Sequence, residues 1–386
     1  MGRRNWMAAA ISLGLAGTVV PAMAGPAPVE IFRTALEQAA ATLPDSPGIV
    51  VSVQAPRRGI DWQASTGKAD PGGTPLTPDH PFRVASVTKA FVAAAILRLE
   101  EEGKLSLSQP IKALIAPETA VLLRSGGYDP DRITVRHLMD HTSGLRDFFD
   151  DPAYEKTMLA QPKRRWARLE QIAIAMKVGP AYGAPGERFH YADTGYSLLG
   201  EVLERATGLA MGPALRSLLP YDGLGLYNTW LESLEPAPTG VKPRAHQYAS
   251  GIDMTGADPS YDLYGGGGLV STLGDLVRFF RGIFRGHVFR DPATLAAGLT
   301  LATAEAGEGY MLMARPALFA PEKVGPHACL GLGGYYGTLV VHCPAIDLTI
   351  GFNANTANPD SFDVAAKFME AVGSVLGTEP STAPSR

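Results

Sequence analysis

The segment "FRVASVTKAFVAAAILRLEEEGKL", residues 82–104, constrains this chain more than any other part of its sequence. It places Ser86 and Lys89 three positions apart at the start of an apolar run that predicts a helix. Residues three apart in a helix face the same side, so the amine of Lys89 can reach the hydroxyl of Ser86. The start of a helix also leaves unpaired backbone N–H groups and the positive end of the dipole beside that hydroxyl.

This pair has two interpretations. Ser86 is either a nucleophile with Lys89 as its proton partner, or a helix N-cap followed by a lysine in the first turn. The second interpretation fits less well, because the helix dipole disfavours a cation at the N-terminus. The Ser-x-x-Lys spacing alone is a weak signal, since many chains of this length contain it by chance.

Composition narrows the class of protein. The 386 residues can bury the core of one large two-lobed domain or of two domains. A content of 46% hydrophobic and 19% charged residues is typical of a globular protein. The net charge of −4 shows no excess of basic residues, so we do not expect nucleic acid to be a partner. The short basic run at 163–168 is expected to be a solvated helix face.

The first 24 residues are predicted to be a secretory signal peptide and not part of the fold. Two arginines, a short apolar stretch and the small-x-small triplet 22–24 precede Gly25, which is the order of such a signal. The apolar stretch is too short and too interrupted for a membrane-spanning helix. We therefore expect an exported protein, periplasmic or secreted in a bacterium, with no stable membrane span.

Export makes the two cysteines informative. Cys329 and Cys343 bracket "LGLGGYYGTLVVH", a glycine-rich centre followed by an apolar, β-branched run. If this is a hairpin that turns near Tyr335 and Tyr336, the two cysteines lie opposite each other. An oxidising compartment then favours a disulfide, and the alternative is a pair of buried thiols.

The order of helical and strand patterns predicts an α+β fold. Strand patterns occur near both ends of the chain and helical patterns lie outside them, while the middle is mostly helix and loop. This order indicates an antiparallel β-sheet flanked by terminal helices, with an inserted mostly helical lobe. The expected boundaries are a sheet lobe at about 25–85 and 311–376, a helical lobe at about 105–310, one domain over 25–376, and a flexible tail at 377–386.

Five segments, the first of which contains Ser86 and Lys89, make the Ser86 motif more specific. In order they are "FRVASVTKAFVAAAILRLEEEGKLSLSQPI", "HLMDHTSGL", "PGERFHYADTGYSLLGEVLERATG", "GGGGLVSTLGDLVRFF" and "GLGGYYG". Together they resemble the serine β-lactamase and DD-peptidase superfamily, in particular its class C-like branch with the family VIII esterases and D-aminopeptidases. The resemblance runs from about 30 to 375, and it implies the β-lactamase/transpeptidase-like fold.

The resemblance also implies roles for individual residues. Ser86 matches the acylated nucleophile, and Lys89 the lysine that assists its deprotonation. Tyr191 matches the tyrosine of the second box, a general base and proton donor whose pKa a neighbouring lysine cation would lower. The backbone N–H groups of Ser86 and Tyr335 match the oxyanion hole. Without the resemblance, Tyr191 could equally be a core aromatic residue before an apolar helix.

Two positions depart from the pattern of the superfamily. The second box ends in Asp193 instead of asparagine, and the third box is Leu332-Gly333-Gly334 instead of a triplet that begins with Lys or His. In members that cleave penicillins, that cation helps to hold the substrate carboxylate, and losing such a bond costs about 1.5–3 kcal/mol of binding. These substrate-binding positions therefore favour a neutral substrate. Asp193 could instead accept a substrate amine, or pair with Lys89 and make it a poorer base.

The predicted function is an exported serine hydrolase that forms an acyl-enzyme at Ser86, acting on a small or peptide-like ester or neutral amide. One alternative is a penicillin-recognising enzyme, either a β-lactamase or a D-alanyl-D-alanine carboxypeptidase. Another is a binding protein that keeps the fold without turnover. The resemblance implies no cofactor and no metal.

Two other patterns have ordinary explanations. His137 and His141 have a zinc-compatible spacing on a helix, but the glutamate of H-E-x-x-H and a third ligand are missing. The glycine run at 265–268 lacks the ending of a phosphate-binding loop. It precedes Thr272 and Asp275 at capping-box spacing, and is expected to be a tight loop that leads into a helix.

Overall fold

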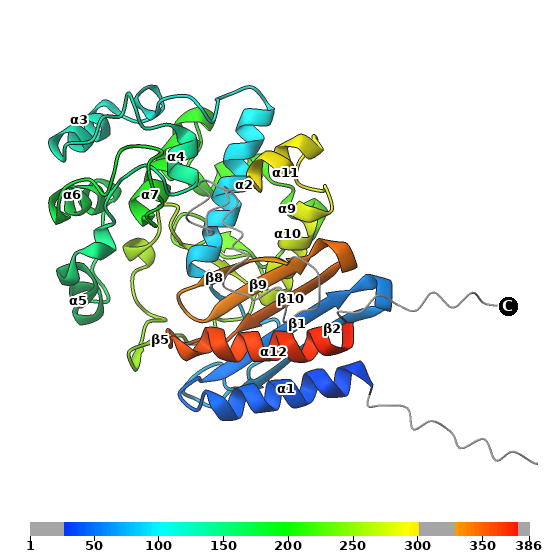
Figure 1. The fold of residues 1–386 in the computed structure, drawn as a ribbon. Coiled ribbons are helices and arrows are strands. Elements are labelled where there is room, and N and C mark those ends of the chain that lie inside the picture. Colours follow the sequence, from blue (N-terminus) through cyan, green and yellow to red (C-terminus); the bar gives the residue numbers. More distant parts are fainter. Residues whose placement is uncertain (1–26, 301–328, 377–386) are drawn as a thin grey trace, which may run out of the picture.

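The structure, a computed structural model, describes residues 27–300 and 329–376 (Figure 1). The predicted signal peptide and the predicted C-terminal tail lie outside these residues. No helix within the described ranges is long and apolar enough to cross a membrane.

A five-stranded antiparallel sheet joins the two ends of the chain. Its strand order is β2–β1–β10–β9–β8, and β1 pairs with β10 so that Val51 lies opposite Phe352. The predicted α+β fold is thereby confirmed. The strands are β1 (Gly48–Ala55), β2 (Ile60–Gly67), β8 (Leu330–Gly334), β9 (Thr338–Cys343) and β10 (Leu348–Asn353).

Helices cover both faces of this sheet. The terminal helices α1 (Pro28–Thr42) and α12 (Asp360–Leu376) lie side by side on one face (Figure 1). On the other face α10 (Leu273–Phe284) packs against the central strands, although it falls within the range expected for the helical lobe. Every residue of β1 is buried because the strand is covered on both sides, which explains its nearly continuous apolar sequence.

The helix that follows Ser86 is the centre of the second lobe. α2 spans Thr88–Glu101, and all of its residues from Thr88 to Leu99 are buried, as expected of a helix that is apolar on every side. It rises from the sheet into the other helices (Figure 1). These are α3 (Pro117–Ser125), α4 (Val135–Met139), α5 (Pro152–Ala160), α6 (Arg168–Val178), α7 (Asp193–Thr207), α8 (Met211–Leu218), α9 (Tyr221–Leu224) and α11 (Pro292–Gly298).

Short strands connect the two lobes. β3 (Phe82–Arg83) pairs with β7 (Leu269–Ser271), which also pairs with β4 (Trp230–Leu231). A separate two-stranded ribbon consists of β5 (Tyr248–Ala249) and β6 (Ile252–Asp253). Because β3 leads directly to the segment with Ser86, this small sheet determines where that segment enters the helical lobe.

The hairpin predicted between the two cysteines is present. β8 and β9 pair with Leu330 opposite His342, so Cys329 lies opposite Cys343. The two sulfur atoms are bonded, and the two Cα atoms are 4.2 Å apart. The disulfide therefore links the N-terminal end of the edge strand β8 to the C-terminal end of β9.

We expect removal of this bond to destabilise the sheet lobe. The bond closes a loop with a sequence separation of 14 residues. In the chain-entropy account, Cys329→Ser with Cys343→Ser should lower the free energy of unfolding by about 3 kcal/mol. Thermal melts with and without reductant provide the measurement. The double variant should not respond to reductant, and a wild-type melting temperature that reductant leaves unchanged would contradict the expectation.

Candidate active site

Ser86 lies in a short 3₁₀ turn, Ala85–Val87, between β3 and α2. Its neighbours Ala85 and Val87 are buried, whereas Ser86 is partly exposed. Ala85 has a φ of 47°, in the left-handed region that costs an L-residue other than glycine about 1–2 kcal/mol. This strained turn presents the Ser86 hydroxyl at the junction between the sheet and the helical lobe.

The three residues predicted to act together do meet. The Ser86 Oγ lies 3.0 Å from Lys89 Nζ and 2.8 Å from the hydroxyl oxygen of Tyr191. α2 begins at Thr88, and no side-chain hydrogen bond caps its N-terminus. The interpretation of Ser86 as an N-cap is therefore wrong, and its hydroxyl instead has two polar partners on its own face.

Lys89 is a fully buried cation. Its Nζ donates to Ser86 Oγ and to the carbonyl oxygen of Gly266 at 2.6 Å, and it forms an ion pair with Asp193. The ring of Tyr191 is also close, with its centroid 5.0 Å from the nitrogen. Burial alone lowers the pKa of Lys89, but Asp193, Tyr191 and Asp262 together outweigh this effect and raise the pKa above the ordinary value of 10.5. Lys89 is therefore an ammonium group at neutral pH.

The ammonium group determines the direction of the hydrogen bonds around Ser86. Because Lys89 donates to Ser86 Oγ, the hydrogen of Ser86 is free to point toward Tyr191. Tyr191 is thus placed to take the proton, but only when its phenol is ionised. Burial, and then the charge of Asp193, raise the pKa of Tyr191, and the neighbouring cation of Lys89 only partly offsets them. The sequence predicted a lowered pKa for Tyr191, and this prediction is wrong because burial and the charge of Asp193 outweigh the effect of Lys89.

Two buried carboxyl groups that sequence analysis missed, those of Asp147 and Asp262, lie beside this group. Asp147 accepts a hydrogen bond from the backbone N–H of Asp193 at 2.7 Å, which anchors the start of α7. Burial and the charge of Asp193 raise the pKa of Asp147 well above its usual range, and the same two causes raise the pKa of Asp262 to about 8. Neither residue belongs to a local pattern, so only the folded chain shows that they gather around one lysine.

The glycine run at 265–268 has a direct part in the site. A Cβ atom on Gly266 would lie 2.9 Å from Asp193 Oδ1 and 2.7 Å from Asp262 Oδ1, so a side chain there would displace these carboxyl groups. This close approach brings the Gly266 carbonyl to Lys89. The run was expected only to lead into a helix. The helix that follows β7 is indeed capped, because the backbone N–H of Asp275 donates to Thr272 Oγ1 at 3.3 Å.

The third box forms the end of β8, which packs against the turn with Ser86. A Cβ atom on Gly334 would lie 2.3 Å from the carbonyl oxygen of Val84, so the two backbones touch. Leu332 is only 3% exposed and belongs to the core on the α2 side of the sheet, so its side chain packs instead of facing an open cleft. At Gly333 an added Cβ would meet the ring of Phe362 at 2.7 Å.

Tyr335 comes directly after this box and is 43% exposed. Its hydroxyl donates to Glu155 Oε1 on α5 at 3.3 Å, across the two lobes. Burial and the charge of Glu155 raise the pKa of Tyr335 to about 12, so its phenol stays neutral. Because Gly334 touches Val84, the backbone of Tyr335 begins close to the Ser86 turn, as an oxyanion hole requires.

The two histidines have structural partners. His137 Nδ1 accepts a hydrogen bond from the backbone of Thr134, and His141 Nδ1 accepts one from the backbone of Ala192. The ring of His141 also stacks on Tyr191 with centroids 4.5 Å apart, which holds the tyrosine in place. Over residues 27–300 and 329–376 no group of three or more His, Cys, Asp or Glu side chains is arranged to hold a metal ion.

Comparison with known proteins identifies the family of this chain. Residues 36–374 match the protein family described as Beta-lactamase. The chain belongs to the beta-lactamase family. Esterase EstB of Burkholderia gladioli is 30% identical over 346 residues, which cover 80% of this chain and 86% of EstB. Penicillin-binding protein 4* of Bacillus subtilis (strain 168) is 23% identical, and the match covers 81% of this chain and 68% of that protein.

Solved structures share the fold of this beta-lactamase family protein. EstCE1, a hydrolase with promiscuous acyltransferase activity, superposes with a TM-score of 0.70 at 21% identity and covers 89% of this chain and 99% of EstCE1. The D-amino acid amidase from Ochrobactrum anthropi SV3, complexed with L-phenylalanine amide, gives a TM-score of 0.68 at 22% identity, with 90% and 99% covered. Family membership makes this chain a serine hydrolase, and the finer questions concern its residues and its substrate.

Replacing Asp193 by the asparagine of the family pattern should shift the pH dependence. Asp193 raises the pKa values of both Lys89 and Tyr191, so Asp193→Asn should lower both. Because the site must lose one proton before Ser86 can be activated, the rising limb of kcat/KM should move to lower pH. The measurement is the pH profile of ester hydrolysis by both proteins.

A matched control lies on the same helix. Glu204 of α7 pairs with Arg168 at 2.7 Å, away from the cluster around Lys89, so Glu204→Gln should leave the profile unchanged. An unchanged limb in Asp193→Asn, or a limb moved to higher pH, would show that the charge of Asp193 does not control the proton of this site.

Proposed function

We propose that this chain is an exported hydrolase of esters or neutral amides that works through an acyl-enzyme at Ser86. The observation that carries the proposal is the ion pair of Lys89 with Asp193. This ion pair holds the Lys89 cation in contact with Ser86. In addition, the third box has Leu332 at the position where the family pattern has a carboxylate-binding cation. A site arranged in this way has little to offer an anionic substrate.

The proposed reaction follows from the contacts. With the Tyr191 phenol ionised, Ser86 Oγ passes its proton to Tyr191 as it bonds to the carbonyl carbon, and the carbonyl oxygen takes the electron pair. Backbone N–H groups of Ser86 and Tyr335 stabilise that oxyanion. Collapse expels the alcohol or amine, which takes the proton from Tyr191. Water then attacks the acyl carbon, gives its proton to Tyr191, and the proton returns to Ser86 as the acid leaves.

An esterase and an amidase among the similar proteins support an ester or amide substrate, and a penicillin-binding protein is also among them. Esterase EstB is 30% identical, and both EstCE1 and the D-amino acid amidase share the fold. A substrate amine bound by Asp193 is disfavoured, because Asp193 is buried and already paired with Lys89. Export rests on the signal-like order of the first 24 residues and on a disulfide that an oxidising compartment would maintain.

A p-nitrophenyl butyrate assay tests the proposal. Wild-type protein should release p-nitrophenol and carry one butyryl group on intact-mass analysis. Loss of the nucleophile should reduce kcat by about 10³-fold or more in Ser86→Ala and abolish the adduct. Ser125→Ala is a matched control, since Ser125 is exposed and its hydroxyl donates to the carbonyl oxygen of Leu122 on its own helix.

Benzylpenicillin in the same assay separates the alternatives. We expect ester turnover to exceed penicillin hydrolysis, because no third-box cation holds the penicillin carboxylate. Faster turnover of penicillin, with a penicilloyl adduct on Ser86, would favour a penicillin-recognising enzyme. Turnover that survives in Ser86→Ala would exclude Ser86 as the nucleophile, and neither turnover nor adduct in wild type would favour a binding protein.

A further inference from the structure

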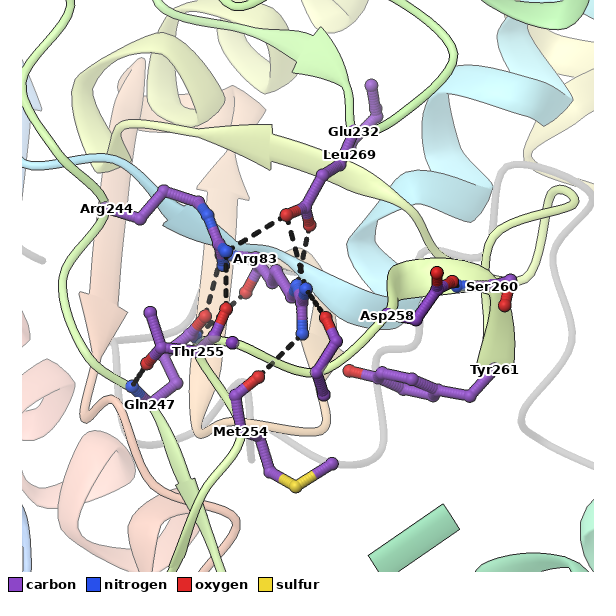
Figure 2. Close-up of polar contacts among 12 residues, drawn as sticks. Arg83, Glu232, Arg244, Gln247, Met254, Thr255, Asp258, Ser260, Tyr261 and Leu269 are labelled. Carbon is purple, nitrogen blue, oxygen red and sulfur yellow. Dashed lines mark hydrogen bonds and ion pairs between the residues drawn. The ribbon is translucent and has the colours of Figure 1, made fainter. Parts of the chain in front are cut away.

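Arg83 stands three residues before Ser86, and its buried guanidinium is the centre of a polar network (Figure 2). It donates to Glu232 Oε2 at 2.6 Å, to the carbonyl oxygen of Met254 at 2.8 Å and to that of Ala257 at 2.6 Å. A buried arginine with paired donors fixes the backbone that it touches. Arg83 therefore ties the strand before the nucleophile to the loop that leads into Tyr261.

The backbone of Arg83 is held as firmly as its side chain. Gln247 accepts from the backbone N–H of Arg83 at 2.8 Å and donates to its carbonyl oxygen at 3.0 Å, as a neighbouring strand would. On the other edge β3 pairs with β7, and the next residue, Val84, donates to the carbonyl oxygen of Leu269 at 3.0 Å. The strand that delivers Ser86 is thus fixed along both edges.

The network continues to Tyr261. The guanidinium carbon of Arg83 lies 5.8 Å from the centroid of the Tyr261 ring. The carbonyl oxygen of Tyr261 accepts from the hydroxyl of Tyr154 at 2.7 Å and from Gln171 Nε2 at 2.9 Å, which anchors it to α5 and α6. Tyr261 is consequently fixed to the nucleophile strand and to the helical lobe together.

A hydrogen bond links Tyr261 to Tyr336, two residues after the third box. Its hydroxyl oxygen lies 2.7 Å from the hydroxyl oxygen of Tyr336, and both side chains are buried. Burial raises the pKa of both phenols, so each stays neutral and one donates to the other. Tyr336 directly follows Tyr335, the residue whose backbone N–H is assigned to the oxyanion hole.

We infer that the hydroxyl pair of Tyr261 and Tyr336, braced by Arg83, positions the backbone N–H of Tyr335 against Ser86. The inference rests on the proposed acyl-enzyme function. Both tyrosines are positioning residues that act through Tyr335 and do not touch the substrate. The nucleophile strand and the oxyanion donor, which are about 250 residues apart in sequence, thereby share one rigid frame. We expect loss of this bond to weaken the stabilisation of the oxyanion, which exists only in the transition state and the tetrahedral intermediate.

Removing either hydroxyl tests the inference. A displaced oxyanion donor should lower kcat for p-nitrophenyl butyrate by about tenfold in Tyr261→Phe and in Tyr336→Phe, with little change in KM. The affinity for phenylboronic acid, which forms a tetrahedral adduct on a serine nucleophile, should fall by the same factor. The double variant should be no worse than either single variant, since both substitutions remove the same bond.

Tyr128→Phe is the matched control. Tyr128 is 5% exposed, and its hydroxyl accepts from the backbone of Arg146 at 3.1 Å in the helical lobe. We expect Tyr128→Phe to lower the melting temperature, as Tyr261→Phe and Tyr336→Phe should, while its kcat and boronate affinity stay at wild-type values.

Four results would overturn the inference. Unchanged kcat and boronate affinity in both variants, with normal Ser86-dependent turnover in wild type, would refute the positioning role and leave the proposed function standing. An equal loss of kcat in Tyr128→Phe would show a general effect of stability. A rise in KM at constant kcat would show that the tyrosines act on substrate binding. Absence of Ser86-dependent turnover in wild type would instead remove the proposed function and this inference with it.

Discussion

The site depends on one buried charge. Lys89 lies at the first turn of α2, with no exposed surface, between the hydroxyl of Ser86, the carbonyl of Gly266 and the carboxylate of Asp193. An isolated ammonium group would be too costly to bury, so the negative partner and the directed acceptors are conditions for its presence. The glycine run, the start of α7 and the turn before α2 are brought together around this nitrogen.

The fold supplies these partners from distant parts of the sequence. α2 is buried on all sides and cannot shift without disturbing both lobes, which fixes Lys89 relative to the sheet. β8 reaches the same turn from the C-terminal part of the chain, where Gly334 allows it to touch Val84. Ser86 and the second assigned oxyanion donor, Tyr335, therefore come from distant parts of the sequence, and the antiparallel sheet holds them together.

The sequence was a good guide to the architecture and to the residues that act together. Periodicity and the order of elements predicted the α+β sheet with its terminal helices, and the cysteine spacing predicted the hairpin with its disulfide. The juxtaposition of Ser86, Lys89 and Tyr191 followed from spaced motifs.

The sequence left open the pairing of Asp193 with Lys89, which the structure shows, but most of the electrostatics of the site could not be predicted from it. Asp147 and Asp262 belong to no motif, and their pKa values depend on burial that only the folded chain creates. Leu332 was expected beside the substrate, but the packing of β8 places its side chain in the core. The pKa of Tyr191 is raised because desolvation, which has no sequence signature, exceeds the effect of the nearby cation.

The protonation state of Lys89 is the claim on which the account depends most, and ¹⁵N NMR of lysine-labelled protein measures it directly. The Nζ signal of Lys89 can be assigned with Lys89→Met. In the wild type it should keep the chemical shift of an ammonium group through pH 10, and in Asp193→Asn the same signal should titrate at lower pH. A wild-type signal that titrates near neutral pH would contradict the account. It would mean that Lys89 is a neutral amine in the resting site and itself takes the proton of Ser86.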